Sequence, residues 1–399
     1  MIQGMSEDRL QRIGKHLDQY VEQGRIPCAV CLVNRRGQEA YFHSTGHSDV
    51  ENKREVQRDT IFRIYSMTKP ITSVALMILY EQGKFQLDDP VAKFVPSWKN
   101  LEVYESGTGA DIVTQPVKNA MTIKHLLTHT AGLTYGFMNS HPVDALYREL
   151  NVEGSGSQST LDDMMERLSK VPLLYDPGSL WSYSSATDVC GYLVQLFGQR
   201  DLDEYIAEEI CSPLGMVDTG FHVAESSADR LAACYQHSSD GFTLQDAAKG
   251  SRYLRRPTFF SGGGGMVSTI DDYQRFVQML LNTGSFNGVR ILGRKTVEYM
   301  ASNHLPGNVD LAAMGQPVFS ETSFAGVGFG LGFSVVVDPP SASVLDSVGE
   351  FAWGGAASTY FWIDPVEELT VVFMTQLLPS STWPIRRELK TLVYQSLTD

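Results

Sequence analysis

The sequence lacks several features that would mark a membrane, metal-binding or nucleotide-binding protein. None of its apolar stretches reaches the roughly 20 residues of a membrane-spanning helix, and residues 1–10 carry no basic-then-apolar signal pattern. It has no Cys and His residues at metal-ligand spacing and no phosphate-binding Gly-x-x-x-x-Gly-Lys motif. We therefore expect a cytoplasmic protein that begins at Met1, needs no metal or cofactor and does not contact membranes.

Cysteine is scarce and its pattern does not suggest cross-links. The five cysteines are an odd number, and Cys28 and Cys31 fall within a predicted strand, where an offset of three residues points them to opposite faces. We expect reduced, buried thiols.

Positive charge is in deficit, because the net charge is −14 and the sequence pI is about 5.1. This balance argues against nucleic acid or an anionic membrane as a partner. The Gly-x-Ser-x-Gly nucleophile motif is also missing, which argues against an ordinary α/β-hydrolase. A small molecule is the expected partner, and the sequence leaves the oligomeric state open.

The first candidate catalytic pair is Ser66 and Lys69, which precede a long apolar run at residues 71–80. Residues three apart lie on one face of a helix, so the hydroxyl and the amine can meet as a nucleophile and its base. Pro70 is tolerated only in a first helical turn, so the helix is predicted to start at or just before Ser66 and to stop at Gly83. The serine would then lie at the positive end of the helix dipole.

Taken alone, this pair has a second interpretation, in which Ser66 caps a helix and Lys69 is solvated. A Ser-x-x-Lys pattern therefore needs its context before it indicates catalysis. Residues 74–79 are all apolar, which favours a helix that runs through the protein interior. Such a helix would be a rigid platform for a nucleophile.

The two ends of the chain predict one sheet-containing domain. The N-terminal part predicts an amphipathic helix, a hairpin and a short strand, at residues 6–24, 29–34 with 40–44, and 61–65. The last third predicts strands at 331–337, 344–350, 359–363 and 369–376, a helix opening at 271–273, and a closing helix at 384–397. We predict an α/β (α+β) fold, with a mainly antiparallel sheet flanked by helices and formed by residues 1–83 and 223–399.

Residues 84–222 are predicted to form an inserted, largely helical domain. Its helical segments are 90–94, 123–129, 144–150, 160–168, 186–197 and 202–211. The loops 101–117 and 151–158 are longer and richer in Gly and Ser than packing needs, which suggests lips of a substrate site.

Two glycine-rich stretches do not indicate a nucleotide site. The four glycines at 262–265 could form a phosphate loop, but we favour a backbone that passes close beneath an active site. The Gly-x-Gly repeats at 326–332 lack the βαβ setting of a dinucleotide site.

Tyr183 is the second candidate, because it lies in a loop just before a helix that is predicted to begin near Ala186. Its phenol becomes a competent base if a neighbouring ammonium stabilises the phenolate. The alternative is a tyrosine that packs flat with its hydroxyl on a carbonyl. The residue by itself does not decide between them.

Six motifs follow one another in a fixed order along nearly the whole chain. They are Ser66-Met67-Thr68-Lys69, Leu126-Leu127-Thr128-His129-Thr130-Ala131-Gly132-Leu133, Trp181-Ser182-Tyr183-Ser184-Ser185, Pro213-Leu214-Gly215-Met216, residues 262–269 with Asp272-Tyr273, and Trp353-Gly354-Gly355. As a set they resemble the serine β-lactamase-like superfamily, most closely the class C β-lactamases and, within that circle, the family VIII carboxylesterases.

Two departures from the penicillin-recognising members bear on the substrate. Those enzymes carry Lys or His, then Thr or Ser, then Gly beside the nucleophile, and Trp353-Gly354-Gly355 stands at that position here. They also have Asn two residues after the tyrosine, where this chain has Ser185. Both changes are similar to those in the esterases, so Trp353, Gly354, Gly355 and Ser185 are the predicted substrate-binding residues.

The resemblance implies that Ser66 attacks an ester carbonyl and that Lys69 and Tyr183 share the proton transfer. Either group must lose about 3 pKa units, or about 4 kcal/mol, to act as a base at neutral pH. A coupled pair titrates as a unit, so the sequence does not assign the base. The implied oxyanion hole consists of the backbone amides of Ser66 and Ala356.

The leading hypothesis is a serine carboxylesterase for short-chain acyl esters. The alternatives are an acyltransferase, a weak β-lactamase, or a D-amino-acid peptidase or amidase that uses the same site. A non-catalytic scaffold would require the serine, the lysine or the tyrosine to be missing, and all three are present.

Overall fold

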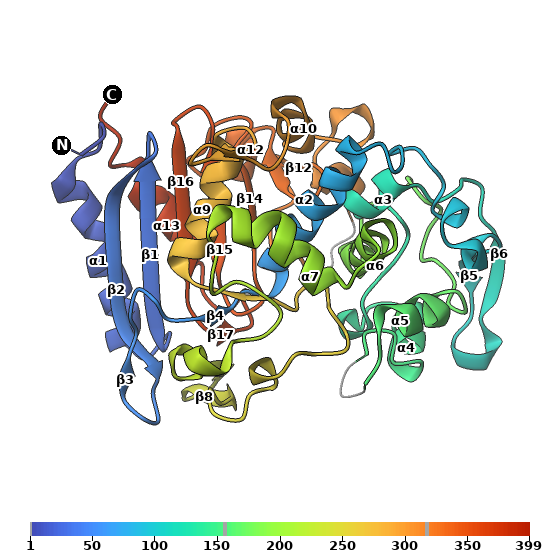
Figure 1. Ribbon diagram of the computed structural model, residues 1–399, viewed down its shortest axis with the longest axis horizontal. Coiled ribbons are helices and arrows are strands. Elements are labelled where there is room, and N and C mark those ends of the chain that lie inside the picture. Colours follow the sequence, from blue (N-terminus) through green and yellow to red (C-terminus); the bar gives the residue numbers. More distant parts are fainter. Residues whose placement is uncertain (1, 155–157, 316–318) are drawn as a thin grey trace.

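The computed structural model describes residues 2–154, 158–315 and 319–399. The main sheet contains β1 (Cys28–Arg35), β2 (Gln38–Asp49), β3 (Arg54–Glu55), β12 (Val327–Phe329), β13 (Ser334–Val336), β14 (Phe351–Gly354), β15 (Tyr360–Asp364) and β16 (Leu369–Met374). Its strand order is β12-β13-β14-β15-β16-β1-β2-β3, and the paired strands are antiparallel. The pairing of β1 with β16 joins the two ends of the chain (Figure 1). The predicted antiparallel sheet is confirmed.

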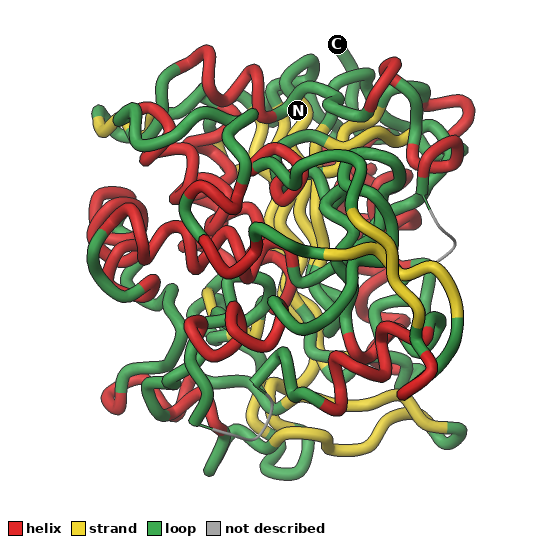
Figure 2. Tube along the Cα trace, turned by 90° about the vertical axis from the view of Figure 1, so that its right-hand side faces the viewer, coloured by secondary structure: helices red, strands yellow, loops and turns green. Residues whose placement is uncertain are grey.

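The side chains of β1 alternate between two hydrophobic cores, as the strand period of two requires. Cys31 and its alternate neighbours face a core formed with α1 (Glu7–Glu22) and α13 (Ile385–Tyr394). Cys28 and its alternate neighbours face the larger core, which contains α9 (Ile270–Leu281) and α2 (Thr68–Glu81). Figure 2 shows a group of strands running through the middle of the view, with helices on both sides.

The five cysteines are buried and unpaired, and Cys28 and Cys31 lie on opposite faces of the sheet. This placement confirms the predicted orientation of the two thiols. It also removes them from solvent, and burial raises the pKa of each of the two thiols to about 12. They act as small apolar core residues.

The helices between α2 and the last third of the chain are α3 (Ile123–Leu127), α4 (Pro142–Glu149), α5 (Leu161–Leu168), α6 (Ala186–Gly198), α7 (Leu202–Ile206) and α8 (Ser212–Leu214). The apolar helix α2 packs directly against α6 and α7. Because α2 is buried along almost its whole length, it links the sheet-containing part to the helical part.

The chain also contains smaller strands and α-helices. The strands are β4 (Phe62–Arg63), β7 (Cys234–Ser238), β8 (Gly241–Asp246), β9 (Val267–Ser268), β10 (Ser285–Phe286), β11 (Val289–Arg290) and β17 (Leu377–Leu378). The helices are α10 (Arg294–Met300), α11 (Leu311–Met314) and α12 (Pro339–Ala342). The β4–β9 pair aligns the segment that leads to Ser66 with the segment that follows the four glycines.

Three local predictions are wrong. Residues 101–117 form a hairpin of β5 (Glu102–Ser106) and β6 (Val113–Pro116), in which Gly107 adopts a positive φ, and not a plain loop. Residues 344–350 do not form a strand, because the Pro339-Pro340 pair starts α12 and the chain then loops back toward β14. The α-helix that follows Ser66 begins at Thr68, two residues later than predicted.

The second predicted lip, residues 151–158, lies partly outside the described residues, since 155–157 are not described. Among the helices that the structure does describe, none combines the length and the apolar composition needed to cross a bilayer.

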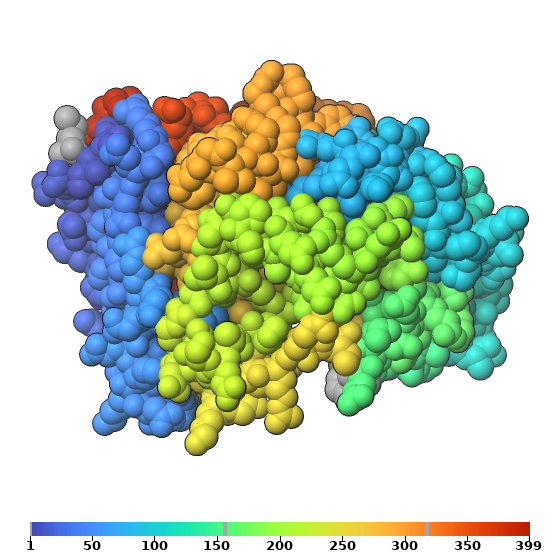
Figure 3. Space-filling view, viewed as in Figure 1, coloured from blue at the N-terminus to red at the C-terminus, as the bar shows by residue number. Residues whose placement is uncertain are grey.

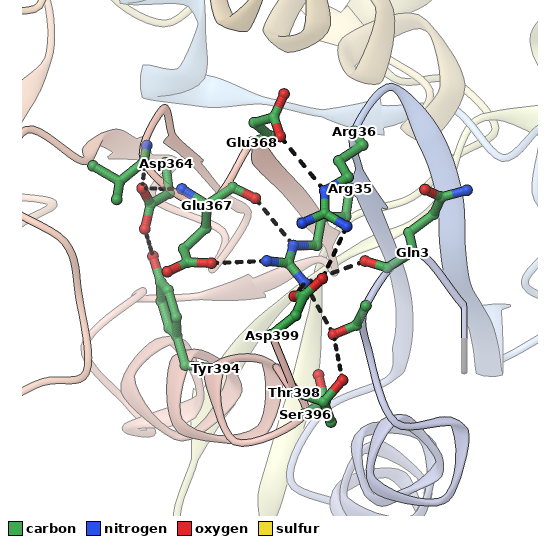
Figure 4. A network of polar contacts seen from close by, with 12 residues as sticks. Gln3, Arg35, Arg36, Asp364, Glu367, Glu368, Tyr394, Ser396, Thr398 and Asp399 are labelled. Atoms are coloured by element: carbon green, nitrogen blue, oxygen red, sulfur yellow. Dashed lines mark hydrogen bonds and ion pairs between the residues drawn. The ribbon is translucent and has the colours of Figure 1, made fainter.

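The two termini are held together by one buried arginine (Figure 4). Arg35 donates hydrogen bonds to the backbone carbonyls of Gln3 and Gly4. It also binds the carboxylates of Glu367 at 2.9 Å and Asp399 at 2.6 Å. These contacts fasten both chain ends to the loop between β15 and β16.

Candidate active site

The nucleophile candidate lies in a short, strained turn. Residues Tyr65–Met67 form a 3-10 turn that runs into α2, and Tyr65 has a φ of 43°, in the left-handed region. A large non-glycine residue in that region costs roughly 1–3 kcal/mol, so the surrounding packing must enforce it. Ser66 is therefore presented by a turn at the N-terminal end of a buried helix, where the first amides lack helical acceptors.

The structure brings the three predicted catalytic side chains together. The Tyr183 hydroxyl donates to Ser66 Oγ at 2.6 Å. Lys69 Nζ lies 3.4 Å from Ser66 Oγ and donates to the Gly263 carbonyl at 2.7 Å. All three side chains are at least nine-tenths buried, so their mutual contacts are little screened by water.

Burial lowers the pKa of the Lys69 ammonium to about 8, and the negative charges of Asp188 and Glu321 oppose that change. The ammonium also lies 4.4 Å from the centre of the Tyr183 ring and 5.3 Å from that of Tyr135. A lysine with this pKa is partly neutral near pH 8, which allows it to accept a proton.

Burial has the opposite effect on Tyr183, because it disfavours a phenolate. It raises the pKa of Tyr183 well above its usual value, and the charge of Glu321 adds to the increase. Tyr183 is therefore the protonated partner, in agreement with its role as hydrogen-bond donor to Ser66.

His129 braces the segment that carries Tyr183. Its carbonyl accepts the Ser182 amide at 2.9 Å and its Nδ1 contacts the Ser184 hydroxyl at 3.2 Å, so it holds the chain on both sides of the tyrosine. Its ring lies 5.2 Å from that of Tyr183. Burial lowers the pKa of His129 well below its usual value, so the imidazole is neutral.

Asp188 positions the glycine that receives Lys69. Its carboxylate accepts the Gly263 amide at 3.0 Å and the Ser261 hydroxyl at 2.6 Å. A side chain at Gly263 would place its Cβ 2.5 Å from the carboxylate and 2.9 Å from the Tyr135 hydroxyl. The backbone here passes so close to the site that only glycine fits, as the glycine-rich stretch predicts.

The predicted oxyanion residue Ala356 lies in the turn after β14. This turn is closed by two backbone hydrogen bonds, from the Gly355 amide to the Thr359 carbonyl and from the Ser358 amide to the Gly355 carbonyl. Ala356 and Ser66 both line the same cavity. Within the described ranges, the Ala356 amide has no backbone acceptor, which leaves it free to bind a substrate oxygen. A Cβ at Gly355 would stand 2.3 Å from the Ile64 carbonyl, so glycine allows this turn to approach the nucleophile.

A buried ion pair holds that turn from behind. The Arg386 guanidinium donates to the carbonyls of Gly355 at 2.7 Å and Thr359 at 2.8 Å, and it binds the Glu321 carboxylate at 2.7 Å. It also fills the space that a side chain at Gly354 would need, since a Cβ there would lie 2.5 Å from the guanidinium carbon. Gly354 is thus needed for this clamp.

The site opens into a cavity of about 1100 Å³. Its described lining includes Ser66 and Tyr183, the rings of Phe137, Phe221, Phe259 and Phe319, and a basic loop at residues 252–256. The loop after β8 that carries these basic residues runs from the sheet side toward the helical side (Figure 1). The lining combines aromatic rings with polar and charged side chains, as is typical of a site for an organic ligand.

The other predicted substrate-binding residues lie behind the cavity lining. Trp353 is fully buried and packs its ring 5.5 Å from that of Tyr183 and 5.3 Å from that of Phe329. Ser185 is fully buried at the start of α6. Neither these two nor Gly354 and Gly355 belong to the described lining, so each would affect substrate through the residues in front of it.

Sequence reasoning missed Asp188, Glu321, Arg386 and Tyr135. Asp188 follows Tyr183 by five residues, and Tyr135 follows the 126–133 motif by two, so both lie beside recognised segments. Glu321 and Arg386 carry no local signal, because they approach the site from distant parts of the chain. In the part of the chain that the structure describes, no group of three His, Cys, Asp or Glu residues could hold a metal ion.

The profile of the Beta-lactamase family matches residues 13–395 of this chain. The chain belongs to the Beta-lactamase family. This assignment agrees with the large antiparallel sheet and with the Ser66, Lys69 and Tyr183 geometry. It confirms the predicted resemblance to the serine β-lactamase-like proteins and the predicted fold class.

The proteins similar to this chain include esterases and acyltransferases. Esterase EstB of Burkholderia gladioli is 29% identical over 401 residues, which cover 96% of this chain and 94% of EstB. The solved structure of EstCE1, a hydrolase with promiscuous acyltransferase activity, matches with a TM-score of 0.81 at 30% identity and covers 97% of this chain and 98% of its own. Protein Rv1367c of Mycobacterium tuberculosis is 36% identical over 360 residues, 89% of this chain and 87% of its own length. The protein is an enzyme of the serine hydrolase type.

Proposed function

We propose that this protein is a serine carboxylesterase that forms an acyl-enzyme on Ser66. The observation that carries the proposal is the 2.6 Å hydrogen bond from the Tyr183 hydroxyl to Ser66 Oγ, with the Lys69 amine 3.4 Å from the same oxygen. A buried nucleophile with two proton-transfer partners at the wall of a cavity that contains several aromatic rings suits acyl transfer from an ester.

In this mechanism neutral Lys69 takes the proton of Ser66 while Oγ bonds to the ester carbonyl carbon. The backbone amides of Ser66 and Ala356 stabilise the oxyanion that forms. When the intermediate collapses, the C–O bond to the alcohol breaks, Tyr183 gives its proton to the departing oxygen, and Lys69 returns a proton to Tyr183. Water then attacks the acyl-enzyme by the same route in reverse, releasing the acid.

A second candidate function is acyl transfer to an alcohol instead of water. The cavity of about 1100 Å³ favours it, since this volume exceeds what a short-chain ester fills and could hold an organic acceptor. The acyltransferase activity of the similar EstCE1 supports the same candidate. A weak β-lactamase or D-amino-acid peptidase activity would use the same three catalytic side chains.

The finer placement near class C β-lactamases and family VIII carboxylesterases also belongs to the proposal. By resemblance, Trp353 stands where penicillin-recognising relatives carry a cation. Since its indole is buried behind the cavity lining, this position offers no cation to the substrate, and we expect neutral groups next to the scissile bond. The unpaired, buried cysteines suit a cytoplasmic location, and the net charge of −14 argues against nucleic acid as a partner.

The test is a panel of p-nitrophenyl esters of increasing acyl length, run beside nitrocefin and repeated with an added alcohol acceptor. We expect ester turnover in wild type, weak nitrocefin turnover, and none of either in Ser66→Ala, which changes one small residue of the turn before α2 and should leave the helix intact. A fluorophosphonate should label Ser66 at one equivalent. Turnover that persists in Ser66→Ala would place the nucleophile elsewhere.

A chelator provides a further check. We expect EDTA to leave ester turnover unchanged, because the proposed mechanism uses only side chains and backbone amides. Activity lost in EDTA and restored by zinc would contradict it.

A further inference from the structure

One segment of the cavity wall differs in charge from the rest of the protein. Residues 249–256 carry four cations, Lys249, Arg252, Arg255 and Arg256, and no acidic residue, in a chain whose net charge is −14. The three arginines line the cavity that contains Ser66, and Lys249 does not belong to the described lining. This segment lies at the surface, in yellow, on the face shown in Figure 3.

Among the described residues, two of the three arginines form no ion pair with a carboxylate. Arg256 forms ion pairs with Asp201 at 2.7 Å and Asp203 at 2.6 Å, so its charge is compensated. Across the described residues, neither Arg252 nor Arg255 lies within 4.0 Å of an acidic oxygen. Arg252 rests on the Tyr253 ring at 5.1 Å, and Arg255 is exposed.

The acidic residues of the lining do not neutralise these two arginines. Glu153 accepts the Gly136 amide at 2.7 Å, and Asp188 accepts the Ser261 hydroxyl at 2.6 Å and the Gly263 amide at 3.0 Å. The uncompensated charge in the cavity is therefore positive.

The basic segment is fixed to the strand that leads to the nucleophile. Ser251 accepts a hydrogen bond from the fully buried Arg63 at 2.9 Å and donates to Asp246 at 3.0 Å. The Tyr253 carbonyl accepts the Val223 amide at 2.7 Å. Since Arg63 precedes Ser66 by three residues on the same segment, the arginines are held in a set position relative to the reacting serine.

We propose that Arg252 and Arg255 form an anion-binding subsite, and that the enzyme acts on esters carrying a carboxylate or phosphate at the end remote from the scissile bond. Guanidinium groups bind both anions through paired N–H donors. The aromatic rings of the cavity lining would hold the apolar body of the substrate. This inference rests on the proposed esterase function, because it names the substrate class of the same site.

Matched pairs of substrates test the proposal by turnover. One pair places the charge on the acyl side and compares the mono-p-nitrophenyl ester of suberic acid with p-nitrophenyl octanoate. The other set places the charge on the alcohol side. It compares two anionic substrates, 6-acetoxy-2-naphthoate and 6-acetoxy-2-naphthyl phosphate, with the neutral methyl 6-acetoxy-2-naphthoate. At low salt we expect kcat/KM about tenfold higher for the anionic member of at least one pair. The advantage should shrink as salt screens the arginines.

Substitutions locate the effect. The ratio of anionic to neutral kcat/KM should fall toward 1 in Arg252→Gln/Arg255→Gln, and partly in Arg255→Gln alone. Lys249→Gln is the matched control, since it removes the same charge from the same segment outside the described lining. A ratio unchanged in the double variant, or lowered equally by Lys249→Gln, would overturn the subsite.

Binding without turnover separates this inference from the esterase proposal. Ser66→Ala protein should bind 2-naphthoate and 2-naphthyl phosphate about tenfold more tightly than neutral 2-naphthol, and Arg252→Gln/Arg255→Gln should abolish that preference. If wild type hydrolyses no ester but this preference holds, the esterase proposal fails and the subsite stands. Equal affinity for the three probes would overturn the subsite alone.

Discussion

At the scale of single residues, the site shifts the pKa values of two neighbouring groups in opposite directions. Burial acts on both, but it lowers the pKa of the Lys69 ammonium to about 8 and raises that of the Tyr183 phenol, because each group is favoured in its neutral form. At pH 8 the lysine can therefore accept a proton and the tyrosine can donate one. The sequence left the base unassigned, and the difference in burial effects favours Lys69.

This assignment predicts the pH dependence of catalysis. If Lys69 must be neutral to accept the Ser66 proton, kcat/KM for a neutral ester should rise with pH through a midpoint near 8 and level off above it. The charge of Asp188 keeps the pKa of Lys69 higher than burial alone would, so Asp188→Asn should move the midpoint to lower pH. A midpoint that stays in place or rises in Asp188→Asn would contradict the assignment.

The pair should also behave as one proton path. Lys69→Ala and Tyr183→Phe should each lower kcat by roughly 10²- to 10⁴-fold. The double variant should be little slower than the slower single variant, because either loss interrupts the same transfer. Purified variants and a neutral p-nitrophenyl ester suffice for the measurement. Losses that multiply in the double variant would show two independent roles.

At the scale of elements, the turn after β14 depends on a helix that is distant in sequence. Arg386 on α13 binds the carbonyls of Gly355 and Thr359, on either side of the proposed oxyanion residue Ala356. Glu321 fixes the guanidinium from the other side. The clamp therefore determines where the Ala356 amide points.

We predict that Arg386→Ala lowers kcat by roughly 10- to 100-fold with a smaller change in KM, because a misplaced oxyanion amide weakens transition-state binding most. Added guanidinium at millimolar concentration should restore part of kcat by filling the vacated space. Arg387→Ala, an exposed neighbour on the same helix, is the control and should show neither effect. A loss without rescue, together with a lower Tm, would indicate that Arg386 only stabilises the fold.

At the scale of the whole molecule, both chain ends close the structure on the sheet. Arg35 is buried and carries hydrogen bonds to the N-terminal segment, the β15–β16 loop and the C-terminal Asp399 (Figure 4). The adjacent Arg36 binds Asp399 and Glu368 but is exposed.

We predict that Arg35→Ala lowers the free energy of unfolding by about 2–4 kcal/mol, since the hydrogen bonds and ion pairs that the buried guanidinium makes with several acceptors are lost together. Arg36→Ala should cost less than about 1 kcal/mol, because exposed ion pairs contribute little. Urea denaturation of both variants measures the difference. If both variants lost the same free energy of unfolding, the contacts of the buried Arg35 would stabilise the fold no more than those of the exposed Arg36.

The sequence determined the parts of this protein that follow from local periodicity. The apolar run of β1, the amphipathic α1 and α13, and the apolar run of α2 each specify surface to bury, so the antiparallel sheet and its flanking helices were predictable. Turns and short elements were harder to predict from the sequence. The proline pair at 339–340 starts a helix before the strand expected at 344–350, and residues 102–116 form a hairpin where a loop was expected. The division into 1–83 with 223–399 and 84–222 stays a prediction.

The sequence also predicted Ser66, Lys69 and Tyr183, because each lies in a motif that can be recognised locally. Only the tertiary structure brought the carboxylates of Asp188 and Glu321 to Lys69, set Arg386 behind Gly355, and placed Arg252 and Arg255 in the cavity wall. Contacts between residues far apart in the chain have no local pattern. Their chemistry depends on burial and distance, which exist only once the chain has folded.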